Sequence, residues 1–533
     1  MRSDCIPFSA IPHSSHLFLD FLSHSSKVEA FFPQGTHTSS VFEEAKTLIF
    51  DDARRKRVAD VLQRQNRSWL AGEATFRNID RLRNGAVAVV SGQQVGLFGG
   101  PLYSVLKAVS AIRLAHDIAA QGVEAIPVFW LATEDHDLAE VNNALLPVSG
   151  GGVKRFTSTS AGASTAPVAH IEFGAEIEEL VSEACAVLGE SEAAEALRAS
   201  YRAGENYGSA FAKLFARLFK EQGLVLMDPI DAEWHEIATP VFLKAAERAA
   251  ELDEALLTRG TQLRSAGYHE QVKVTGESTL LFAFEDGGRT VVHRANGDFM
   301  IGNTRVAKED LLRHISEHPE RFSPNVLLRP IMQDFLLPTV TYFGGPAEIA
   351  YFAQAAVVYQ EVIGRVTHIR PRLSATLVDG RMQRLLNRYS LFLPDLFHVG
   401  DHLPELLASK VLPGELSAEF EKAERGLADS LAALRNSVEK LDKTLVDALD
   451  RSARKMQYQL GKIKTKAARA ELRKSEQLTS DAREISTLLF PEKNLQEREL
   501  AGIYFLAKHG LSLIDELIAA AGTQCPGHQV YFL

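Results

Sequence analysis

Apolar positions along this chain follow distinct periods, and each period predicts a different kind of element. Short apolar runs at 86–90 and 126–132 are typical of buried strands, and between them Leu102, Val105, Leu106, Val109 and Ile112 repeat at helical spacing. Strand, helix and strand at this spacing predict a βαβ unit with parallel strands and a right-handed crossover. An amphipathic helix at 211–223, followed by the apolar segment "LVLMDP", predicts a further step of the same sheet.

Two stretches interrupt this pattern. The segment 149–164 is rich in Gly, Ser and Thr, which predicts a loop or the boundary of an inserted segment. Residues 271–306 alternate like short strands and carry the hairpin sequences "FEDGGRTVV" and "RANGDFMIGN". We therefore predict an α/β fold in which a doubly wound parallel-sheet core is interrupted by two inserted modules.

Apolar residues then change to heptad spacing between about 413 and 489. One helix of this length would extend roughly 110 Å at about 1.5 Å per residue. A helical hairpin that turns near Leu441–Thr444, with Asp442 as a cap, is the more economical of the two alternatives. The sequence therefore predicts a coiled-coil arm.

The predicted boundaries follow from these changes of pattern. A helical N-terminal segment (1–82) packs on a core whose three parts are 83–147, 206–233 and 323–400. The inserted modules are 148–205 and 234–322, the arm is 401–490, and a C-terminal segment (491–533) returns to the core.

Composition narrows the class of protein. The chain has 46% hydrophobic and 24% charged residues, as soluble globular proteins do. Its formal net charge of -10 argues against a nucleic-acid-binding surface as its main function. It has no apolar run of about 18 residues and no signal-peptide pattern, so we expect no membrane span and a cytoplasmic location. Cys5, Cys185 and Cys525 lie far apart, and their spacing suggests neither a disulfide framework nor a zinc site.

A glycine-rich turn, "SGQQVGLFGGPLY", joins the first predicted strand to its helix. It matches neither the dinucleotide-binding fingerprint nor the P-loop. Its glycines (Gly92, Gly96, Gly99 and Gly100) would let backbone N–H groups approach a ligand beside the N-terminus of the helix near Pro101. Gln93 and Gln94 would add amide groups. The alternative is a purely structural turn.

The segment "TEDHD" follows the next strand directly. It places Glu134, Asp135, His136 and Asp137 at the carboxyl edge of the sheet, where ligands of open α/β sheets bind. His136 between two aspartates could act as a general base, and its pKa would be raised by their charges. The carboxylates could instead hold Mg²⁺ or another divalent ion. A solvated acidic turn is the third alternative.

Two later motifs repeat this logic. "GGPAEIAYFAQ" (344–354) is a second strand–Gly-Gly-Pro–helix junction, and "HIRPRLSAT" places Arg370, Arg372 and Ser374 at a strand end, where they suit phosphate or carboxylate. Each motif alone is more often structural. Together with the acidic segment they predict an active site at one edge of the sheet.

Five segments, in this order, resemble the bacillithiol biosynthesis cysteine-adding enzymes. They are "SGQQVGLFGGPLYSVLKA", "PVFWLATEDHDLAEVNN", "LLRPIMQDFLLPTVTYFGGPAEIAYFAQ", "RPRLSATLVD" and "LFPEKNLQEREL", and the resemblance spans essentially the whole chain. It implies a cytoplasmic ligase that forms an amide between the carboxyl group of L-cysteine and the sugar amine of glucosaminyl-malate. It also implies a Rossmann-like core with two connecting-peptide insertions, and a coiled-coil arm that forms a homodimer.

The motifs and the resemblance together suggest candidate roles. The catalytic residues would be Glu134, Asp135, His136 and Asp137. The substrate-binding residues would be Gly92, Gln93, Gln94, Gly96, Gly100, Pro101, Tyr103, Arg329, Gln333, Asp334, Gly344, Gly345, Glu348 and Tyr351. An adenine nucleotide, ATP or ADP, would bind at Arg370, Arg372, Ser374, Gln496 and Arg498, with Glu497 in the same segment.

A carboxylate does not acylate an amine at a useful rate without activation, so we expect ATP, with Mg²⁺ as a candidate ion. A synthetase-like adenylation motif is missing from the sequence. Two other functions remain open, a coiled-coil scaffold with a nucleotide-sensing core and a metal-dependent hydrolase that uses the acidic segment.

Overall fold

A five-stranded parallel sheet lies at the centre of the computed structural model, which describes residues 2–162, 165–285, 287–522 and 525–533. The strand order is β13 (His368–Pro371), β12 (Thr339–Gly344), β2 (Val87–Gln93), β3 (Ala125–Leu131), β6 (Val225–Met227). Read by chain order within this sheet, it is the doubly wound order 3-2-1-4-5, seen from the opposite edge. The predicted α/β core is confirmed.

Helices cover both faces of this sheet because its strands are apolar on both sides. Along β2, Val87 and Val89 pack toward α5 (Leu102–Ala120) and α2 (Thr38–Thr47), whereas Ala88 and Val90 belong to the core on the opposite face. That opposite core also contains side chains of α3 (Asp52–Ser68), α4 (Glu73–Arg83), α10 (Ala232–Glu247) and α14 (Pro346–Ile363). The predicted helix after Pro101 is therefore confirmed as α5, with Pro101 at its N-cap.

The first inserted module follows β3. A hairpin of β4 (Asn143–Val148) and β5 (Gly152–Thr157) leads to α7 (Glu176–Leu188), α8 (Glu192–Ser200) and α9 (Tyr207–Leu218), which returns to the sheet at β6. The loop predicted at 149–164 is wrong for its central part, because Gly152–Thr157 pairs with β4 as a strand. Residues 163–164 of that stretch lie outside the described residues.

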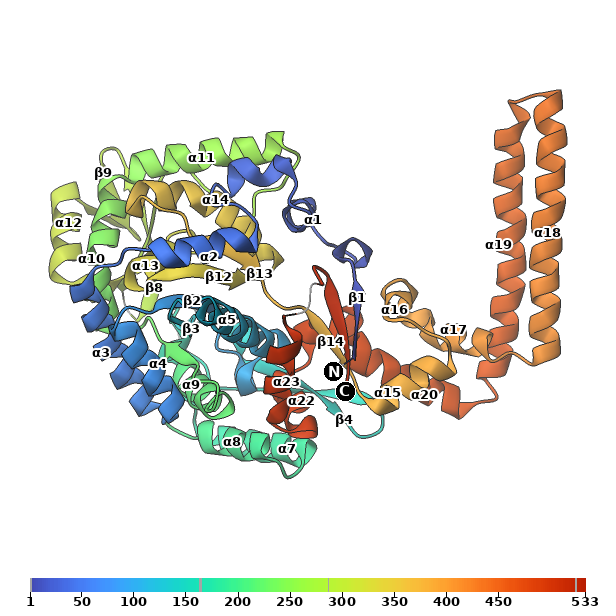
Figure 1. Cartoon of the computed structure of the whole chain (residues 1–533), viewed down its shortest axis with the longest axis horizontal. Coiled ribbons are helices and arrows are strands. Elements are labelled where there is room, and N and C mark those ends of the chain that lie inside the picture. The colour runs from blue at the N-terminus through green and yellow to red at the C-terminus, as the bar shows by residue number, and fades with distance from the viewer. Residues whose placement is uncertain (1, 163–164, 286, 523–524) are drawn as a thin grey trace.

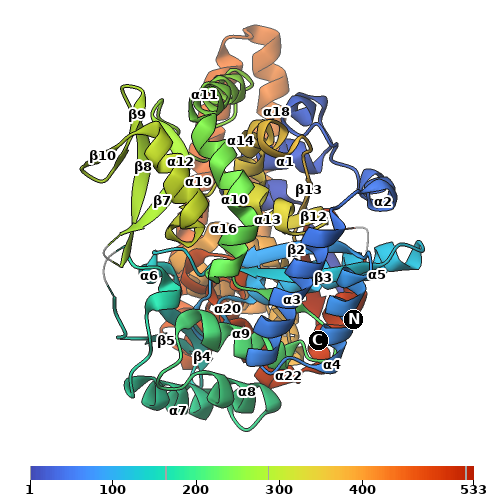
Figure 2. The same ribbon diagram turned by 90° about the vertical axis from the view of Figure 1, so that its left-hand side faces the viewer.

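The second module follows α10 and α11 (Ala249–Ser265), and its β-rich character is confirmed. Strands β7 (Ser278–Glu285), β8 (Gly288–Ala295), β9 (Asp298–Ile301), β10 (Thr304–Val306) and β11 (Phe322–Pro324) form an antiparallel sheet beside α12 (Lys308–Glu317). Figure 2 shows this sheet at one side of the body. Position 286, in the first predicted hairpin, lies outside the described residues. Helix α13 (Arg329–Leu336) then leads the chain back to β12.

The coiled-coil segment is a helical hairpin, as predicted. Helices α18 (Gly414–Leu441) and α19 (Leu445–Leu472) run side by side and project away from the body (Figure 1). At the turn, Asp442 Oδ1 accepts hydrogen bonds from the backbone N–H and the hydroxyl of Thr444, both at 2.8 Å. The turn therefore has the predicted cap.

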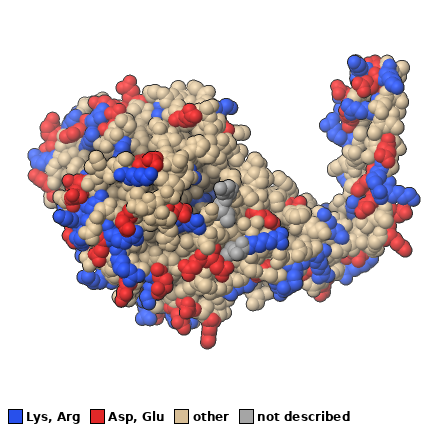
Figure 3. Space-filling model, viewed as in Figure 1, with Lys and Arg blue, Asp and Glu red and all other residues tan. Residues whose placement is uncertain are grey.

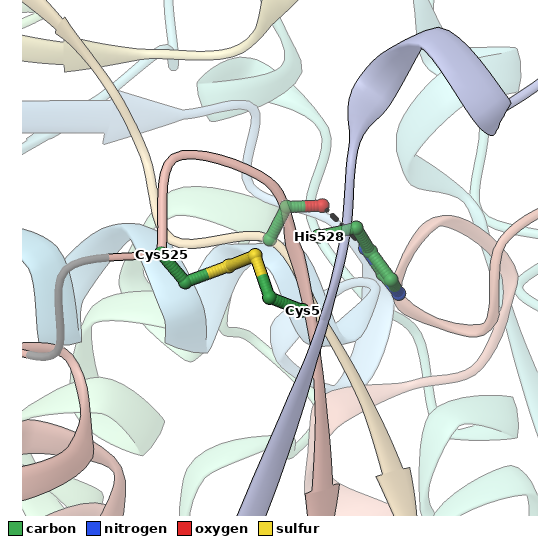
Figure 4. Close-up of a disulfide and its surroundings, with 4 residues drawn as sticks. Cys5, Cys525 and His528 are labelled. Carbon is green, nitrogen blue, oxygen red and sulfur yellow. Dashed lines mark hydrogen bonds between the residues drawn. A yellow bond between two sulfur atoms is a disulfide. The ribbon is translucent and has the colours of Figure 1, made fainter.

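The two ends of the chain meet in a small third sheet. Its order is β1 (Arg2–Ile6), β15 (His528–Phe532), β14 (Ala375–Val378), and both termini lie beside it in Figure 1. Cys5 and Cys525 form a disulfide there (Figure 4). The expectation that the cysteines form no disulfide is therefore wrong, because the fold brings residues 520 positions apart to a Cα–Cα distance of 5.9 Å. The N-terminal segment also begins with a strand, not a helix.

The other helices connect these parts. Their bounds are α1 His16–Leu22, α6 Leu138–Val141, α15 Gly380–Arg388, α16 Leu393–Val399, α17 Leu403–Lys410, α20 Glu476–Leu489, α21 Gln496–Glu499, α22 Gly502–His509 and α23 Ser512–Ala520. In the described part of the chain, no helix is both long and apolar enough to cross a membrane. On the face drawn in Figure 3, acidic and basic side chains are intermixed over the body and the arm.

Candidate active site

A cleft of about 960 Å³ opens at the carboxyl ends of β2 and β12. The strand order changes direction between these two neighbours, because β3 follows β2 on one side and β13 follows β12 on the other. Ligands of open α/β sheets bind at such a switch point. Both predicted glycine junctions and the acidic segment line this cleft.

The first junction extends further along the strand than expected. Strand β2 continues through Gly92 to Gln93, because Gly92 has no Cβ that would lie 2.7 Å from the Trp130 carbonyl oxygen on β3. Phe98, Gly99 and Gly100 then have positive φ angles of 57°, 88° and 71°, which turn the chain into α5. The residues of this junction that line the cleft are Gly92, Gln93, Gln94, Gly96, Gly100, Pro101 and Tyr103.

The second junction holds its helix by a carboxylate cap. Glu348 Oε2 accepts a hydrogen bond from the Gly345 N–H at 2.7 Å, and Glu348 Oε1 accepts one from the Tyr342 hydroxyl at 2.7 Å. Gly345, Glu348 and Tyr351 line the cleft, whereas Gly344 does not. A Cβ at Gly344 would lie 2.7 Å from the Glu348 Cβ, so this glycine allows the close packing of strand and helix.

Lys107 of α5 joins the two junctions. Its Nζ donates to the Gly92 carbonyl oxygen at 2.7 Å and to Gln93 Oε1 at 2.8 Å, and it lies 2.6 Å from Glu348 Oε2. Burial lowers the pKa of Lys107. Burial alone would raise the pKa of Glu348, but the Lys107 charge and the hydrogen bonds from Gly345, Lys107 and Tyr342 together outweigh it, so that pKa lies below its usual value. Sequence reasoning missed Lys107, although a lysine within an apolar helix was a visible sign.

Some side chains of the acidic segment line the cleft, and one binds the local backbone instead. Glu134, Asp135 and His136 line the cleft. Asp137 does not, because its carboxylate caps α6 by accepting from the Glu140 N–H at 3.3 Å. The His136 side chain is 42% exposed, and its Nδ1 lies 3.8 Å from Asp135 Oδ1.

Glu134 is the buried carboxylate of the segment. Its Oε1 lies 3.0 Å from Nε2 of His235, a buried residue of α10. Burial alone would lower the pKa of His235, but the hydrogen bond and charge of Glu134, together with hydrogen bonds to the Pro229 and Pro319 backbone, outweigh it and the net shift is upward. Behind them Thr133 donates a short hydrogen bond to Asp228, and burial raises the pKa of Asp228 to about 6. Neither His235 nor Asp228 was identified from the sequence.

Glu140 is a further acidic group of the cleft that the sequence analysis missed. Gln94 Nε2 donates to a Glu140 carboxylate oxygen and to Asp135 Oδ2, at 3.2 Å in the second case. Burial and the charges of Asp137 and Asp135 raise the pKa of Glu140. The first junction and the acidic segment are therefore hydrogen-bonded to each other.

Of the three candidates on α13, only Arg329 reaches the cleft. Its Nη2 donates to the Tyr351 hydroxyl at 3.1 Å, and its Nη1 donates to Gln333 Oε1 at 3.2 Å. Gln333 and Asp334 are buried and bonded to each other, with Gln333 Nε2 donating to Asp334 Oδ1 at 2.9 Å. Gln333 accepts from Arg329 and is itself held by Asp334, so the two residues fix the position of the guanidinium.

The five residues predicted to bind a nucleotide are not gathered in one place. Arg372 lines the cleft, but it is buried in an ion pair with Glu497 at 2.8 Å. Ser374 also bonds to Glu497, at 2.8 Å, and to His528. Burial lowers the pKa of His528 to about 4. Glu497 therefore fastens the C-terminal segment to the core.

Of the remaining members, Gln496 and Arg498 lie on α21, whereas Arg370 lies apart from them. Gln496 is buried against the backbone of Leu377, and Arg370 donates to the Thr36 carbonyl oxygen at 2.6 Å, away from the cleft lining. Arg498 is exposed and lines the cleft, and within the described ranges it has no ion-pair partner. Binding of a nucleotide by this set stays a prediction.

The cleft is therefore lined by both carboxylates and cations. Glu134, Asp135 and Glu140 can attract an ammonium group or accept a proton, and Arg329 and Arg498 can hold an anion. Considering only the residues whose placement is described, no three His, Cys, Asp or Glu side chains form a group that could hold a metal ion. The lining thus suits a polar substrate that carries both charges.

Two family descriptions match the whole length of the chain. Residues 1–373 match "Bacillithiol biosynthesis BshC, N-terminal Rossmann-like domain", and residues 375–533 match "Bacillithiol biosynthesis BshC, C-terminal coiled-coil domain". The division at 374 falls between β13 and β14, where the sheet of the core gives way to the third sheet.

Similar proteins carry the same family name. A protein of Koribacter versatilis named "Putative cysteine ligase BshC" is 48% identical over 530 residues, with 99% of each chain covered. A protein of the same name from Solibacter usitatus is 36% identical over 533 residues, again with 99% of each chain covered. A solved structure titled as a putative arginyl t-RNA synthetase, from Campylobacter jejuni, is 10% identical, with 88% and 99% coverage, and its TM-score of 0.23 is too low to support any conclusion.

Proposed function

The chain belongs to the bacillithiol biosynthesis BshC family, and on that premise we propose that it is a cysteine ligase. In the proposed reaction, L-cysteine is added to glucosaminyl-malate, and an amide forms between the cysteine carboxyl group and the sugar amine. This would be the last step of bacillithiol biosynthesis, and the proposed location is the cytoplasm. The observation that carries the proposal is the switch-point cleft, where acidic and basic side chains face one polar volume.

The carboxylate wall supplies the proton acceptor that amide formation needs. The amine nitrogen attacks the activated carbonyl carbon, a C–N bond forms, the bond to the activating oxygen breaks, and the amine gives up a proton. Glu134 is buried, and the pKa of Glu140 is raised, so each can take a proton inside the cleft. His136 is a third candidate for this role, and its side chain is 42% exposed.

We further propose that ATP is the activating co-substrate, since a free carboxylate is a poor acyl donor. ATP would convert the carboxylate oxygen into a leaving group. Of the residues predicted for the nucleotide, Arg498 best fits contact with a phosphate, because it lines the cleft and has no ion-pair partner in the described part of the chain. The carboxylates of the acidic segment do not fit Mg²⁺, because Asp137 already caps α6. We therefore derive no step through that ion.

A second copy of the chain is the proposed partner of the arm. Leu434, Leu441, Leu445, Met456 and Ile463 of the heptad pattern remain exposed on the hairpin. Apolar residues at heptad positions pack against another helix in coiled coils. Their exposure supports a homodimer through α18 and α19.

Mass spectrometry tests the ligase proposal directly. The chain is incubated with cysteine, glucosaminyl-malate and either ATP or no nucleotide, and the expected product is the amide, formed only with ATP. Product without ATP would overturn the activation proposal, and no product under any condition would overturn the ligase. Breakdown of one substrate alone would favour the hydrolase.

Variants then test the acid–base assignment. Glu134→Gln, Asp135→Asn, His136→Ala and Glu140→Gln each remove one group, and loss of the proton acceptor typically costs about 10²- to 10⁴-fold in kcat. Asp137→Asn serves as the comparison, because that carboxylate caps α6 outside the cleft. Near-normal kcat in all four cleft variants would contradict the assignment.

A further inference from the structure

Arg289 of β8 brings a cation into the cleft from the second inserted module. Its Nε donates to Ser323 Oγ at 3.1 Å, and its Nη2 donates to the Pro324 carbonyl oxygen at 2.8 Å. The guanidinium lies over the Phe282 ring, 4.1 Å from the ring centroid. Both Arg289 and Phe282 line the cleft. The side chain is thus held in place by neutral groups only.

Arg329 also lines the cleft and is likewise held by neutral groups, because its hydrogen-bond partners are Gln333 and Tyr351. No carboxylate of the described residues lies within ion-pair distance of either guanidinium. Two other arginines of the lining differ, because Arg372 pairs with Glu497 at 2.8 Å and Arg155 pairs with Glu492 at 2.7 Å. Each half-buried guanidinium thus lacks a direct ion pair and feels carboxylate charge only at longer range, from Glu348 at Arg329 and from Glu134 and Asp135 at Arg289. A bound anion would supply the missing direct partner.

One short segment positions both arginines. The Pro324 carbonyl oxygen receives Arg289, and the Asn325 carbonyl oxygen accepts from the Arg329 N–H at 2.8 Å. Asn325 itself lines the cleft, and its Oδ1 is occupied by the N–H of Leu327 at 2.9 Å. Its amide NH₂ makes no hydrogen bond to any described residue, so it is a free donor. In the sequence Asn325 lies between Arg289 and Arg329.

We propose that Arg289, Asn325 and Arg329 form a carboxylate-binding subsite. This proposal rests on the proposed ligase function. Guanidinium groups bind carboxylates through paired N–H donors, and an amide adds a third donor. Glu134 and Asp135 line the same cleft as the subsite, and their charges act on Arg289. Its occupant is a carboxylate of one substrate, either a carboxylate of the malate moiety or the carboxylate of cysteine.

Steady-state kinetics of Arg289→Gln and Arg289→Lys test the subsite. Loss of a charged hydrogen bond costs roughly tenfold to a hundredfold in affinity, so the Gln variant is expected to raise one KM by about that factor. Lys keeps the charge but not the paired donors, so a smaller rise is expected. Arg305→Gln is the matched control, because it removes one positive charge from the same sheet at an exposed residue outside the cleft.

The two sources of the carboxylate give different results. A raised KM for glucosaminyl-malate, absent when glucosamine without malate is the acceptor, assigns the subsite to malate. A raised KM for cysteine assigns it to the amino acid. Unchanged KM values for both substrates in Arg289→Gln would overturn the subsite.

Binding without turnover separates this proposal from the ligase itself. L-malate and L-cysteine are each titrated into wild type and Arg289→Gln by calorimetry, with melting temperatures recorded to show that both are folded. The expected result is binding of at least one probe by wild type and a loss of about tenfold or more in the variant. A chain that binds a probe through Arg289 but forms no amide would refute the ligase and keep the subsite. Equal affinities in both proteins would refute the subsite.

Discussion

Lys107 and Glu348 form an ion pair that is almost completely buried, with 3% and 18% of their side chains exposed. Removing one partner of such a pair leaves the other charge uncompensated, which typically costs about 3–5 kcal/mol. Lys107→Met is therefore expected to lower the free energy of unfolding by about this amount. Urea denaturation followed by circular dichroism measures it.

The double variant Lys107→Met, Glu348→Gln is the control for that prediction. Gln keeps an acceptor for the Gly345 N–H and removes the charge, so the double variant is expected to be more stable than Lys107→Met alone. If the second substitution destabilises further by its full single-site cost, the two side chains are not coupled.

Asp228 makes the stability of the protein depend on pH. Its pKa is raised by burial from 3.8 to about 6, so the folded state holds the proton more tightly than the unfolded state. The stabilisation from the protonated form is present in acid and is lost as the pH rises through about 6, at no more than about 1.4 kcal/mol per pH unit. The expected result is that Asp228→Asn gains stability relative to wild type between pH 4 and 6, and that the difference is constant above this range.

Chemical denaturation at a series of pH values checks this expectation. A stability difference between the two proteins that is the same at pH 4 and pH 7 would show that Asp228 has an ordinary pKa in the folded state.

At the residue scale, the sequence predicted groups that are contiguous in the chain and missed those that come from separate elements. Glu134 and Asp135 follow one strand directly, so their place at the sheet edge could be inferred. Lys107 and Arg289 come from a helix and from a strand of the second module, and only folding brings them to the same cleft. His235 comes from a third element and meets Glu134 outside the cleft lining. Asp137 shows the converse, because its position in the motif does not reveal that it caps a helix.

At the element scale, the arm carries the prediction of a homodimer. Leu434→Glu together with Ile463→Glu places two charges at exposed heptad positions, which a second copy would have to bury. The expected result is a shift from dimer to monomer in sedimentation velocity, with an unchanged circular dichroism spectrum. Ser437→Glu adds a charge at an exposed position of α18 outside the heptad pattern and is expected to leave the dimer intact. A monomeric wild type would contradict the proposal.

Helices and buried strands were predictable because their periodicity is local. The heptads and Asp442 were enough to predict the hairpin, since an Asx turn is encoded within three residues. The end of β2 was not predictable, because Gly92 reads as a strand terminator in the sequence. It is a strand residue here because of its close approach to Trp130 on the neighbouring strand.

At the scale of the whole molecule, the class of fold followed from the order of elements, whereas the third sheet did not. Alternating strands and helices predict a parallel sheet, and the 3-2-1-4-5 order agrees with that rule. The β1–β15–β14 sheet joins both ends of the chain, and no local pattern relates them. The cysteines were judged by spacing, which is uninformative when the partners are 520 residues apart.

The disulfide is expected to be the main attachment of β1. Four of the five residues of this strand are exposed, so little apolar burial holds it against β15. In Cys5→Ser, the amides of Arg2–Ile6 are therefore expected to exchange hydrogen faster than in wild type, while those of β2 and β3 keep their rates. Hydrogen exchange with mass spectrometry measures both regions.

Reduction of the wild-type protein provides the control. It opens the same bond without a substitution, and Cys185 is a free thiol already. Equal protection of β1 with and without reductant would mean that its pairing with β15 suffices.

The bond between Cys5 and Cys525 also changes the topology of the polypeptide. With it closed, the backbone from one cysteine to the other is a covalent ring that includes the core, both inserted modules and the arm. A protease that cuts the exposed tip of the arm then opens the ring but releases no fragment. Under denaturing conditions the two pieces of the cleaved molecule stay linked until a reductant separates them, so the ring links the covalent integrity of a nicked enzyme to the redox state around it.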